Sequence, residues 1–175
     1  MITYVKRIAC LLSLLVGSTA GLEAMARHDW YAGVVPMSYN KSTNEWNVLL
    51  GLEKYWTDFF YHPTKQGQSA NEVAEKALAA QTNDVYKVRV TSKLFNTKGG
   101  NPLFFVVVPY KSADELRRTA ANKFRRDFVW IPASDFNKRG DISYYSKVEN
   151  KAVNVDRRVK DTIAEFLPKA IAQQR

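Results

Sequence analysis

Residues that could act as nucleophiles or metal ligands are scarce in this sequence of 175 residues. Cys10 is the sole cysteine, and His28 and His62 are the two histidines. Neither histidine stands in a spacing typical of a metal site or a catalytic triad. The sequence therefore predicts no catalytic, cofactor-binding or metal-ligating residue, and no cofactor.

Basic side chains are the densest chemical feature of the sequence. The formal net charge is +9. Guanidinium groups form paired hydrogen bonds with carboxylates and phosphates, so this charge favours anionic partners. The basic residues are not interleaved with aromatic residues in a stacking pattern, so we expect a protein partner or an anionic ligand and no nucleic acid. The densest group comprises Arg117, Arg118, Lys123, Arg125 and Arg126.

Residues 1–26 have the pattern of a cleavable secretory signal peptide. Lys6 and Arg7 precede an apolar stretch, and Ala24 to Ala26 supply the small-x-small pattern that signal peptidases accept. We expect cleavage after Ala26, which leaves residues 27–175 as a single domain. A membrane anchor is the alternative, but the apolar run is shorter than the roughly 20 residues that a bilayer span needs.

Removal of the signal peptide would also remove Cys10 and leave a chain without disulfides. An exported domain without disulfides fits a bacterial periplasm better than a eukaryotic extracellular space. We therefore expect an exported protein in the periplasm or at the outer envelope of a Gram-negative bacterium. Its mature part should have no transmembrane segment.

Three segments of the mature region predict helices. Residues 69–82 are rich in Ala, Glu and Lys, and Ser69 and Glu72 form a capping box at their start. Residues 155–172 carry apolar side chains on one helical face and close the chain. A middle helix is predicted from a second capping box and a buried stripe, which are Ser112 with Glu115, and Leu116, Ala120 and Phe124.

Apolar segments rich in valine and aromatic residues predict the strands. The order of strands and helices favours an α+β fold with a mixed sheet covered by helices. Residues 137–146 are polar and contain a glycine, so they are expected to form a loop. Strands are predicted at residues 30–37, 46–52, 56–61, 85–95, 103–110 and 128–132, with a hairpin between 85–95 and 103–110.

Three stretches of sequence make the chain resemble the Nudix hydrolases. YAGVVPMSYN, followed by NVLLGLEKYWTDFFYHPTKQGQSANEVAEKALAAQTN, is similar to the opening strands, glycine-containing loop and helix of that family. DFVWIPASDF is similar to the family's late strand. The resemblance spans about residues 30–172. It implies a Nudix-like fold, in which helices sandwich a mixed sheet in an α/β/α arrangement.

The signature of that family, the Nudix box, is degenerate in this chain. The family pattern is G-x5-E-x7-R-E-U-x-E-E-x-G-U, where U is a bulky apolar residue. The resemblance places Lys76 at the arginine, and it places Gln68, Ala77, Ala80 and Gln81 at the four glutamates. The family needs these carboxylates to hold Mg²⁺ or Mn²⁺ against a substrate diphosphate. The resemblance therefore implies a Nudix-like protein that has lost its metal ligands.

Replacement of the glutamates leaves an apolar helix face, which should pack against another surface. That surface could be a partner protein or the core of the domain itself. Glu53, Lys54 and Asp58 could line a pocket like the family's, but a solvated loop is the better interpretation. The candidate partner-binding residues are Val73, Ala77, Ala80, Arg117, Arg118, Arg125 and Arg126.

Two functions remain open. The first is a non-catalytic structural or protein-binding module of the bacterial cell envelope, such as an accessory subunit of a large assembly like a secretion system. The second is an exported Nudix-type diphosphate hydrolase with an unconventional metal site. The missing glutamates and the signal peptide both favour the first, because nucleoside diphosphate substrates are mainly cytoplasmic.

Overall fold

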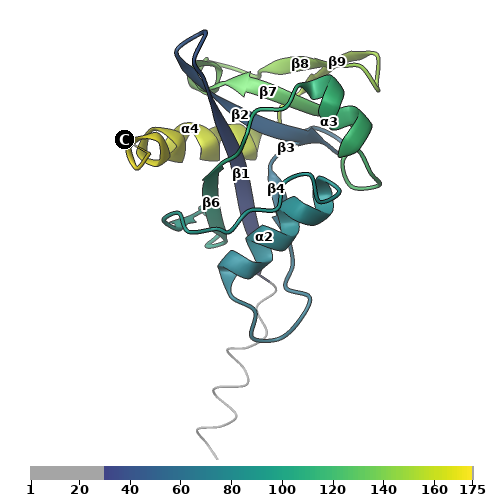
Figure 1. The fold of residues 1–175 in the computed structure, drawn as a ribbon. Helices are drawn as coiled ribbons and strands as arrows, with labels where there is room; N and C mark the ends of the chain where they lie inside the picture. Colours follow the sequence, from purple (N-terminus) through teal and green to yellow (C-terminus); the bar gives the residue numbers. More distant parts are fainter. Residues whose placement is uncertain (1–29, 175) are drawn as a thin grey trace, which may run out of the picture. The chain divides into compact units, whose positions relative to one another are not determined.

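A mixed β-sheet forms the centre of the structure, a computed structural model that describes residues 30–174 (Figure 1). The expected signal peptide lies outside the described residues. The strands of the sheet are β1 (Ala32–Asn40), β2 (Glu45–Leu52), β3 (Trp56–Thr57), β4 (Phe59–Tyr61), β5 (Phe95–Asn96), β6 (Pro102–Val107) and β7 (Phe128–Pro132). The main path runs β3-β2-β1-β6-β5, with β4 paired to β1 and β7 to β2. β1 and β6 are parallel, and the other pairs are antiparallel.

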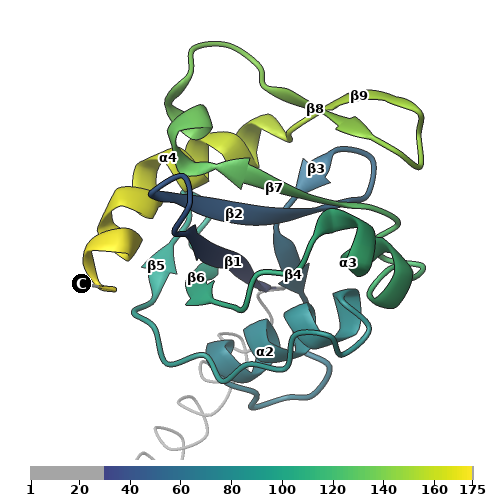
Figure 2. The same ribbon diagram turned by 45° about the horizontal axis from the view of Figure 1, so that its top comes forward.

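Helices cover both faces of the sheet (Figure 2). Val35 and Met37 of β1 share one hydrophobic cluster with Ile163 and Leu167 of the last helix. Val34, which is also buried, points to the opposite face because side chains alternate along a strand. The helices are α2 (Ala70–Gln81) and α3 (Ala113–Thr119) on one face and α4 (Arg157–Ala172) on the other. The mixed α+β fold expected from the sequence is confirmed.

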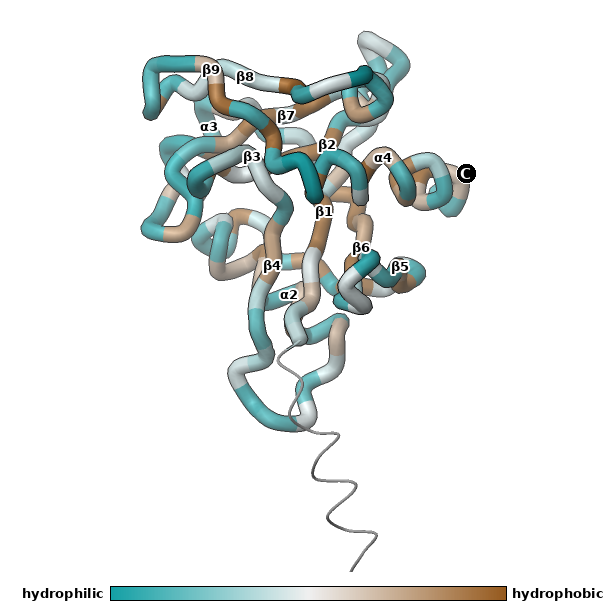
Figure 3. Tube along the Cα trace, turned by 180° about the vertical axis from the view of Figure 1, so that it is seen from behind, coloured by the Kyte–Doolittle hydropathy of each residue, from teal (hydrophilic) through white to brown (hydrophobic). Residues whose placement is uncertain are grey.

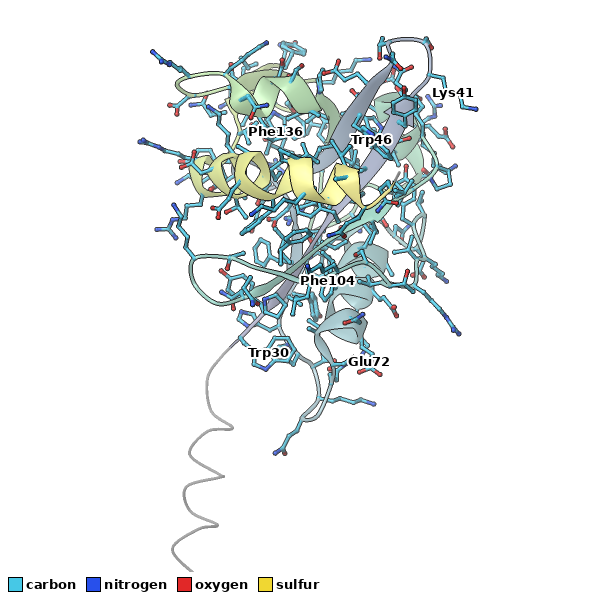
Figure 4. All side chains as sticks on the ribbon, turned by 90° about the vertical axis from the view of Figure 1, so that its left-hand side faces the viewer. Trp30, Lys41, Trp46, Glu72, Phe104 and Phe136 are labelled. Carbon is cyan, nitrogen blue, oxygen red and sulfur yellow. The ribbon has the colours of Figure 1, made fainter. Side chains whose placement is uncertain are left out.

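The apolar residues concentrate where these layers meet. Figure 3 shows hydrophobic residues along β1 and β7 and hydrophilic residues in the connecting loops. In Figure 4, α4 crosses in front of the sheet, and Phe104 and Phe136 mark two parts of the interior. Both phenylalanines are almost completely buried. None of the described helices is both long enough and apolar enough to cross a membrane.

Local signals at helix starts are largely confirmed. Ser69 and Glu72 form the predicted capping box, in which the Ser69 amide donates to Glu72 Oε2 at 2.8 Å and the Glu72 amide to Ser69 Oγ at 3.3 Å. Ser112 Oγ accepts from the Glu115 amide at 3.1 Å. The carboxylate of Glu115 instead binds Lys111 at 2.6 Å, so the second box is half formed.

The strand predicted at residues 85–95 is wrong for all but its last residue, Phe95. Side chains of α2 hold this backbone instead. Glu75 Oε1 accepts from the Val90 amide at 2.7 Å, and Asn71 Nδ2 donates to the Val90 carbonyl at 2.6 Å. The hairpin therefore consists of two paired residues on each side, Phe95–Asn96 in β5 and Pro102 with Leu103 in β6.

Two elements after residue 119 differ from those predicted. The middle helix ends at Thr119 because Asn122 Oδ1 accepts from the amides of Phe124 and Arg125 and forms a turn. Phe124 is consequently 39% exposed and not part of a buried stripe. Part of the expected loop at 137–146 forms a second sheet, in which β8 (Ser143–Ser146) pairs with β9 (Lys151–Asn154). The 3-10 helix η2 (Ala133–Asn137) precedes it.

Candidate functional site

The apolar face of α2 is part of the core. Val73 is 1% exposed and Ala77 0%, because α2 packs on β1 and β4. The prediction that Val73 and Ala77 could contact a partner is therefore wrong for the folded domain. Ala80 is exposed, so of the three helix positions only Ala80 can reach another molecule.

Gln68, at the first glutamate position of the resemblance, organises the loop before α2. Its Oε1 accepts from the amides of Thr64 and Lys65, both at 2.7 Å, and from Thr64 Oγ1 at 3.0 Å. Lys76, at the arginine position, donates to the same threonine hydroxyl at 3.3 Å. These contacts fix the loop but supply no anionic oxygen.

Gln81, at the last glutamate position, is only 3% exposed. Its Nε2 donates to the carbonyl of Phe60 in β4, which ties the end of α2 to the sheet. Its Oε1 is buried and has no hydrogen-bond partner among the described residues. A buried acceptor without a partner is costly to a protein, so this oxygen is a position where a ligand or water donor would be stabilising.

Arg125 lines the same pocket as Gln81 and is 2% exposed. Its guanidinium donates to the carbonyl of Asp58 at 2.9 Å and to Glu53 Oε2 at 3.2 Å, and it lies 5.7 Å from the ring centroid of Phe60. Gly51 gives it room, because a Cβ there would lie 2.5 Å from Arg125 Cδ. Burial lowers the pKa of Arg125 below its ordinary value, although the charges of Glu53 and Asp58 oppose the shift.

These groups border a pocket of about 480 Å³. Its walls come from β4 and the loop after it, from the end of α2 and from residues 123–125. Phe124 provides an aromatic wall, and Lys123 Nζ lies 5.1 Å from the centre of its ring. The pocket combines aromatic surface, two cations and the unpartnered Gln81 oxygen. Such an arrangement, which also includes Glu53 and His62, can bind a ligand.

Glu53 and Lys54 lie in an exposed loop between β2 and β3, as expected, and Glu53 also lines this pocket. Asp58 contacts both Thr57 and Arg125, and its backbone carbonyl accepts from the Arg125 guanidinium. Thr57 Oγ1 donates to Asp58 Oδ1 at 3.2 Å. Burial raises the pKa of Asp58 to about 6, although the Thr57 hydrogen bond and the Arg125 charge lower it. This could not be predicted from the sequence, because the groups around Asp58, Gly33 and Arg125 among them, are distant in the sequence.

Replacement of Asp58 by asparagine should stabilise the protein at alkaline pH. The raised pKa means that the folded state binds the proton more tightly than the unfolded state, so the cost of ionisation is absent near pH 3.8 and complete above about pH 6. We expect Asp58→Asn to raise the free energy of unfolding by about 1–2 kcal/mol at about pH 8 and by almost nothing at about pH 4. Urea unfolding at both pH values measures this, with the exposed Asp141→Asn as the control. An equal effect at both pH values would contradict the prediction.

The basic group predicted from the sequence does not form one surface. Arg125 is buried, so its predicted contact with a partner is wrong. Arg117 binds the buried Asp127 at 2.6 Å and also pairs with Asp114. Arg126 pairs with Glu149 at 2.7 Å and stays exposed, as does Arg118. A role for Ala80, Arg117, Arg118 and Arg126 in partner binding therefore stays a prediction.

The side chains at the box positions do not fit the divalent metal that the resemblance to Nudix hydrolases implies. Gln68 has an amide oxygen that already accepts hydrogen bonds within its loop, and Gln81 has a neutral amide oxygen. Ala77 and Ala80 have only methyl groups. Glu72 and Glu75 are used in the helix cap and in the bond to Val90. Among residues 30–174, no three His, Cys, Asp or Glu side chains are grouped so that they could hold a metal ion. Magnesium prefers anionic oxygens, so no step of a reaction can be assigned to a metal here.

Comparison with known proteins identifies the fold. No protein-family model and no curated protein sequence matches the chain. Among solved structures, a mutT/nudix family protein from Listeria innocua aligns at 14% identity over 83% of this chain and 95% of its own, with a TM-score of 0.53. The NUDIX domain of Shewanella oneidensis NrtR, complexed with ADP ribose, aligns at 13% identity over 85% of this chain and 97% of its own, with a TM-score of 0.51. The chain therefore has a Nudix-like fold.

Proposed function

We propose that this chain is a non-catalytic Nudix-like binding module of the bacterial cell envelope. The observation that carries the proposal is the set of contacts made by α2, the helix that the resemblance aligns with the Nudix box. Ala77 is in the core, and Gln81, which the resemblance aligns with a metal-binding glutamate, donates a hydrogen bond to the Phe60 carbonyl. The pocket beside Gln81 remains, so binding is the function that the site supports best.

The envelope location rests on the pattern of residues 1–26, and membership of a larger assembly such as a secretion system rests on that location. We expect the exported protein to begin at Arg27, because the basic start, apolar stretch and Ala24 to Ala26 act together in signal cleavage. Cell fractionation followed by N-terminal sequencing measures this. Recovery of the chain with Met1 intact in the cytoplasm would overturn the proposed location.

The second candidate function is hydrolysis of a diphosphate by an unconventional metal site. Two carboxylates near the pocket, Glu53 and Asp58, are the observation in its favour. Arg125 argues against it, because its guanidinium already pairs with Glu53 Oε2 at 3.2 Å and its charge lowers the pKa of Asp58. A cation there would have to displace an existing ion pair.

We therefore predict no specific Mg²⁺ or Mn²⁺ site and no metal-dependent turnover. Calorimetric titration of the protein with Mg²⁺ or Mn²⁺ should give no more heat than non-specific binding to surface carboxylates produces, since hard cations need several anionic ligands. ADP ribose, which the Shewanella domain binds in its crystal structure, is the test substrate. An active Nudix enzyme in the same buffer is the positive control. Metal-dependent cleavage that Gln68→Ala or Gln81→Ala abolishes would contradict the proposal.

A further inference from the structure

A second cavity lies between the loop that follows β2 and the β8–β9 hairpin. Its walls are residues 53–55, Arg126 and part of residues 149–154, and no residue of α2 lines it. The cavity has a volume of about 390 Å³. A bridge between Trp56 and Val155 brings the loop and the end of the hairpin together, and β3 and the hairpin are neighbours in Figure 2. Three segments that are far apart in the sequence therefore build one cavity.

Each of the three segments brings one exposed cation to this cavity. These cations are Lys54, Arg126 and Lys151. Lys54 Nζ lies 5.3 Å from the centre of the Tyr55 ring, a cation–π contact. Neither lysine forms an ion pair with a described carboxylate. Because like charges that converge on one cavity repel one another, an anion bound between them would be stabilising.

Both carboxylates at this cavity are already paired. Glu53 Oε2 accepts from Arg125 Nη1 at 3.2 Å, and Glu149 Oε1 accepts from Arg126 Nη2 at 2.7 Å. No other Asp or Glu lines the cavity. The two lysine charges are therefore in surplus. A phosphate monoester carries about −1.5 to −2 charges near pH 7 and would neutralise them.

Arg126 is held across the cavity and can still donate to a ligand. Its Nη2 donates to the Glu53 carbonyl at 3.3 Å as well as to Glu149, and so links the loop to the hairpin. The side chain is 54% exposed. Its Nε and Nη1 have no hydrogen-bond partner among residues 30–174. These N–H groups can bind an anion without breaking either contact.

We propose that this cavity binds the phosphate monoester group of a small hydroxylated ligand, the chemistry of a sugar phosphate. Lys54, Arg126 and Lys151 would bind the phosphate oxygens. Tyr55 and Asn154 are exposed at the same cavity, and their side chains can form hydrogen bonds with hydroxyl groups. The volume of the cavity suits a small molecule. This inference goes beyond the proposed function, because it assigns a ligand to a cavity other than the pocket beside α2.

A phosphorylated lipid in a membrane is a poorer occupant than a soluble ligand. Binding to an anionic membrane surface combines basic residues with apolar side chains that enter the bilayer. Of the large apolar side chains at this cavity, Val153 is buried and only Tyr55 is exposed. The cations also surround one cavity and do not form a row along a flat face.

The lysine test uses calorimetric titration of the full domain with glucose 6-phosphate as the probe. We expect the double variant Lys54→Ala, Lys151→Ala to bind it at least about tenfold more weakly, because the surplus charge is removed. The matched control Lys41→Ala, Lys65→Ala carries the same charge change on two other loops (Figure 4 labels Lys41) and should change affinity less than about twofold. An equal loss in both double variants would mean that net charge alone attracts the probe, and would overturn the inference.

The carboxylate test uses Glu149→Gln, which should bind the probe about threefold more tightly. The change removes a negative charge from the cavity and releases Arg126 Nη2 to the phosphate. Glu165→Gln is the control, because it makes the same charge change at an exposed position of α4 and should leave the affinity almost unchanged. Circular dichroism establishes that both variants are folded. If the pair of Arg126 and Glu149 only holds the hairpin in place, a folded Glu149→Gln variant will bind no better than wild type, which would overturn the inference.

Three further probes test the class of ligand. Glucose should not bind, and inorganic phosphate should bind more weakly than glucose 6-phosphate, because each lacks one half of the ligand. Equal affinity for either probe would overturn the assignment of a sugar phosphate. Binding to vesicles that contain phosphatidic acid, if glucose 6-phosphate does not displace it, would assign the cations to a lipid surface and would also overturn the inference. Metal binding and turnover do not enter these tests, so the inference can fail independently of the proposed function.

Discussion

Asp127→Ala should lose about 3–5 kcal/mol of its free energy of unfolding, because the change breaks a buried ion pair together with its surrounding hydrogen bonds. Asp127 is 1% exposed. Its Oδ1 accepts from Arg117 Nε at 2.6 Å, and its Oδ2 accepts from Ser146 Oγ at 2.8 Å and the Lys147 amide at 3.0 Å. One carboxylate thus joins α3 and β7 to the β8–β9 hairpin.

Asp114→Ala is the matched control, since Asp114 pairs with the same arginine. Its side chain is 51% exposed, and exposed ion pairs contribute about 1 kcal/mol or less. Urea unfolding followed by tryptophan fluorescence measures both variants. Equal losses would show that the contacts of Asp127 are no stronger than a surface pair, and would contradict the prediction.

The pH dependence of the same group has a defined sign. Burial raises the pKa of Asp127, but hydrogen bonds from Arg117 and Ser146 outweigh it and leave the pKa below its ordinary value of 3.8. A depressed folded-state pKa gives stability that is present above pH 3.8 and is lost as the pH falls further. The loss of stability caused by Asp127→Ala should therefore shrink in acid. The gain expected from Asp58→Asn shrinks in acid as well, so the two variants differ in the sign of their effect at neutral pH and not in its trend with pH.

Features set by neighbours in the sequence could be predicted, and features set by distant contacts could not. The α2 capping box and strand β7 match their predictions because a cap depends on residues three apart and a short strand on a local apolar run. The β8–β9 hairpin was missed because its sequence is polar and Asp127, far along the chain, holds its turn. Strand pairing at residues 85–95 failed for the same reason, since Glu75 and Asn71 hold that backbone.

The candidate site shows the same division. The register of the box helix identified Gln68 and Gln81 as positions of interest, and both proved to have structural contacts. Burial of Arg125 could not be predicted, because it requires the absence of a side chain at Gly51. The arginine-rich segment 117–126 was interpreted as one solvated or partner-binding helix face. It cannot be one face, because α3 ends at Thr119, before Arg125 and Arg126.

Glutamate introduced at Ala77 and at Ala80, two of the box positions, should have very different effects on the free energy of unfolding. Ala77 is 0% exposed on the inner face of α2. Ala77→Glu would bury an unpaired carboxylate and overfill a packed core, which should cost at least about 4 kcal/mol and leave the protein largely unfolded. Ala80 is exposed, and only its carbonyl makes a long-range contact, accepting from Asn122 Nδ2 at 2.9 Å. Ala80→Glu keeps that carbonyl and should change stability by about 0.5 kcal/mol or less.

Circular dichroism and thermal unfolding of the two variants decide the point, because both add the same side chain to the same helix three residues apart. A folded Ala77→Glu variant beside an unfolded Ala80→Glu variant would show that the helix is rotated from the orientation described above. The box alignment would then have to shift with it. With the expected result, a glutamate at position 77 is incompatible with this core, so no single substitution there can rebuild the metal face. The packing of the domain then excludes a carboxylate at that position, which supports the binding role proposed above.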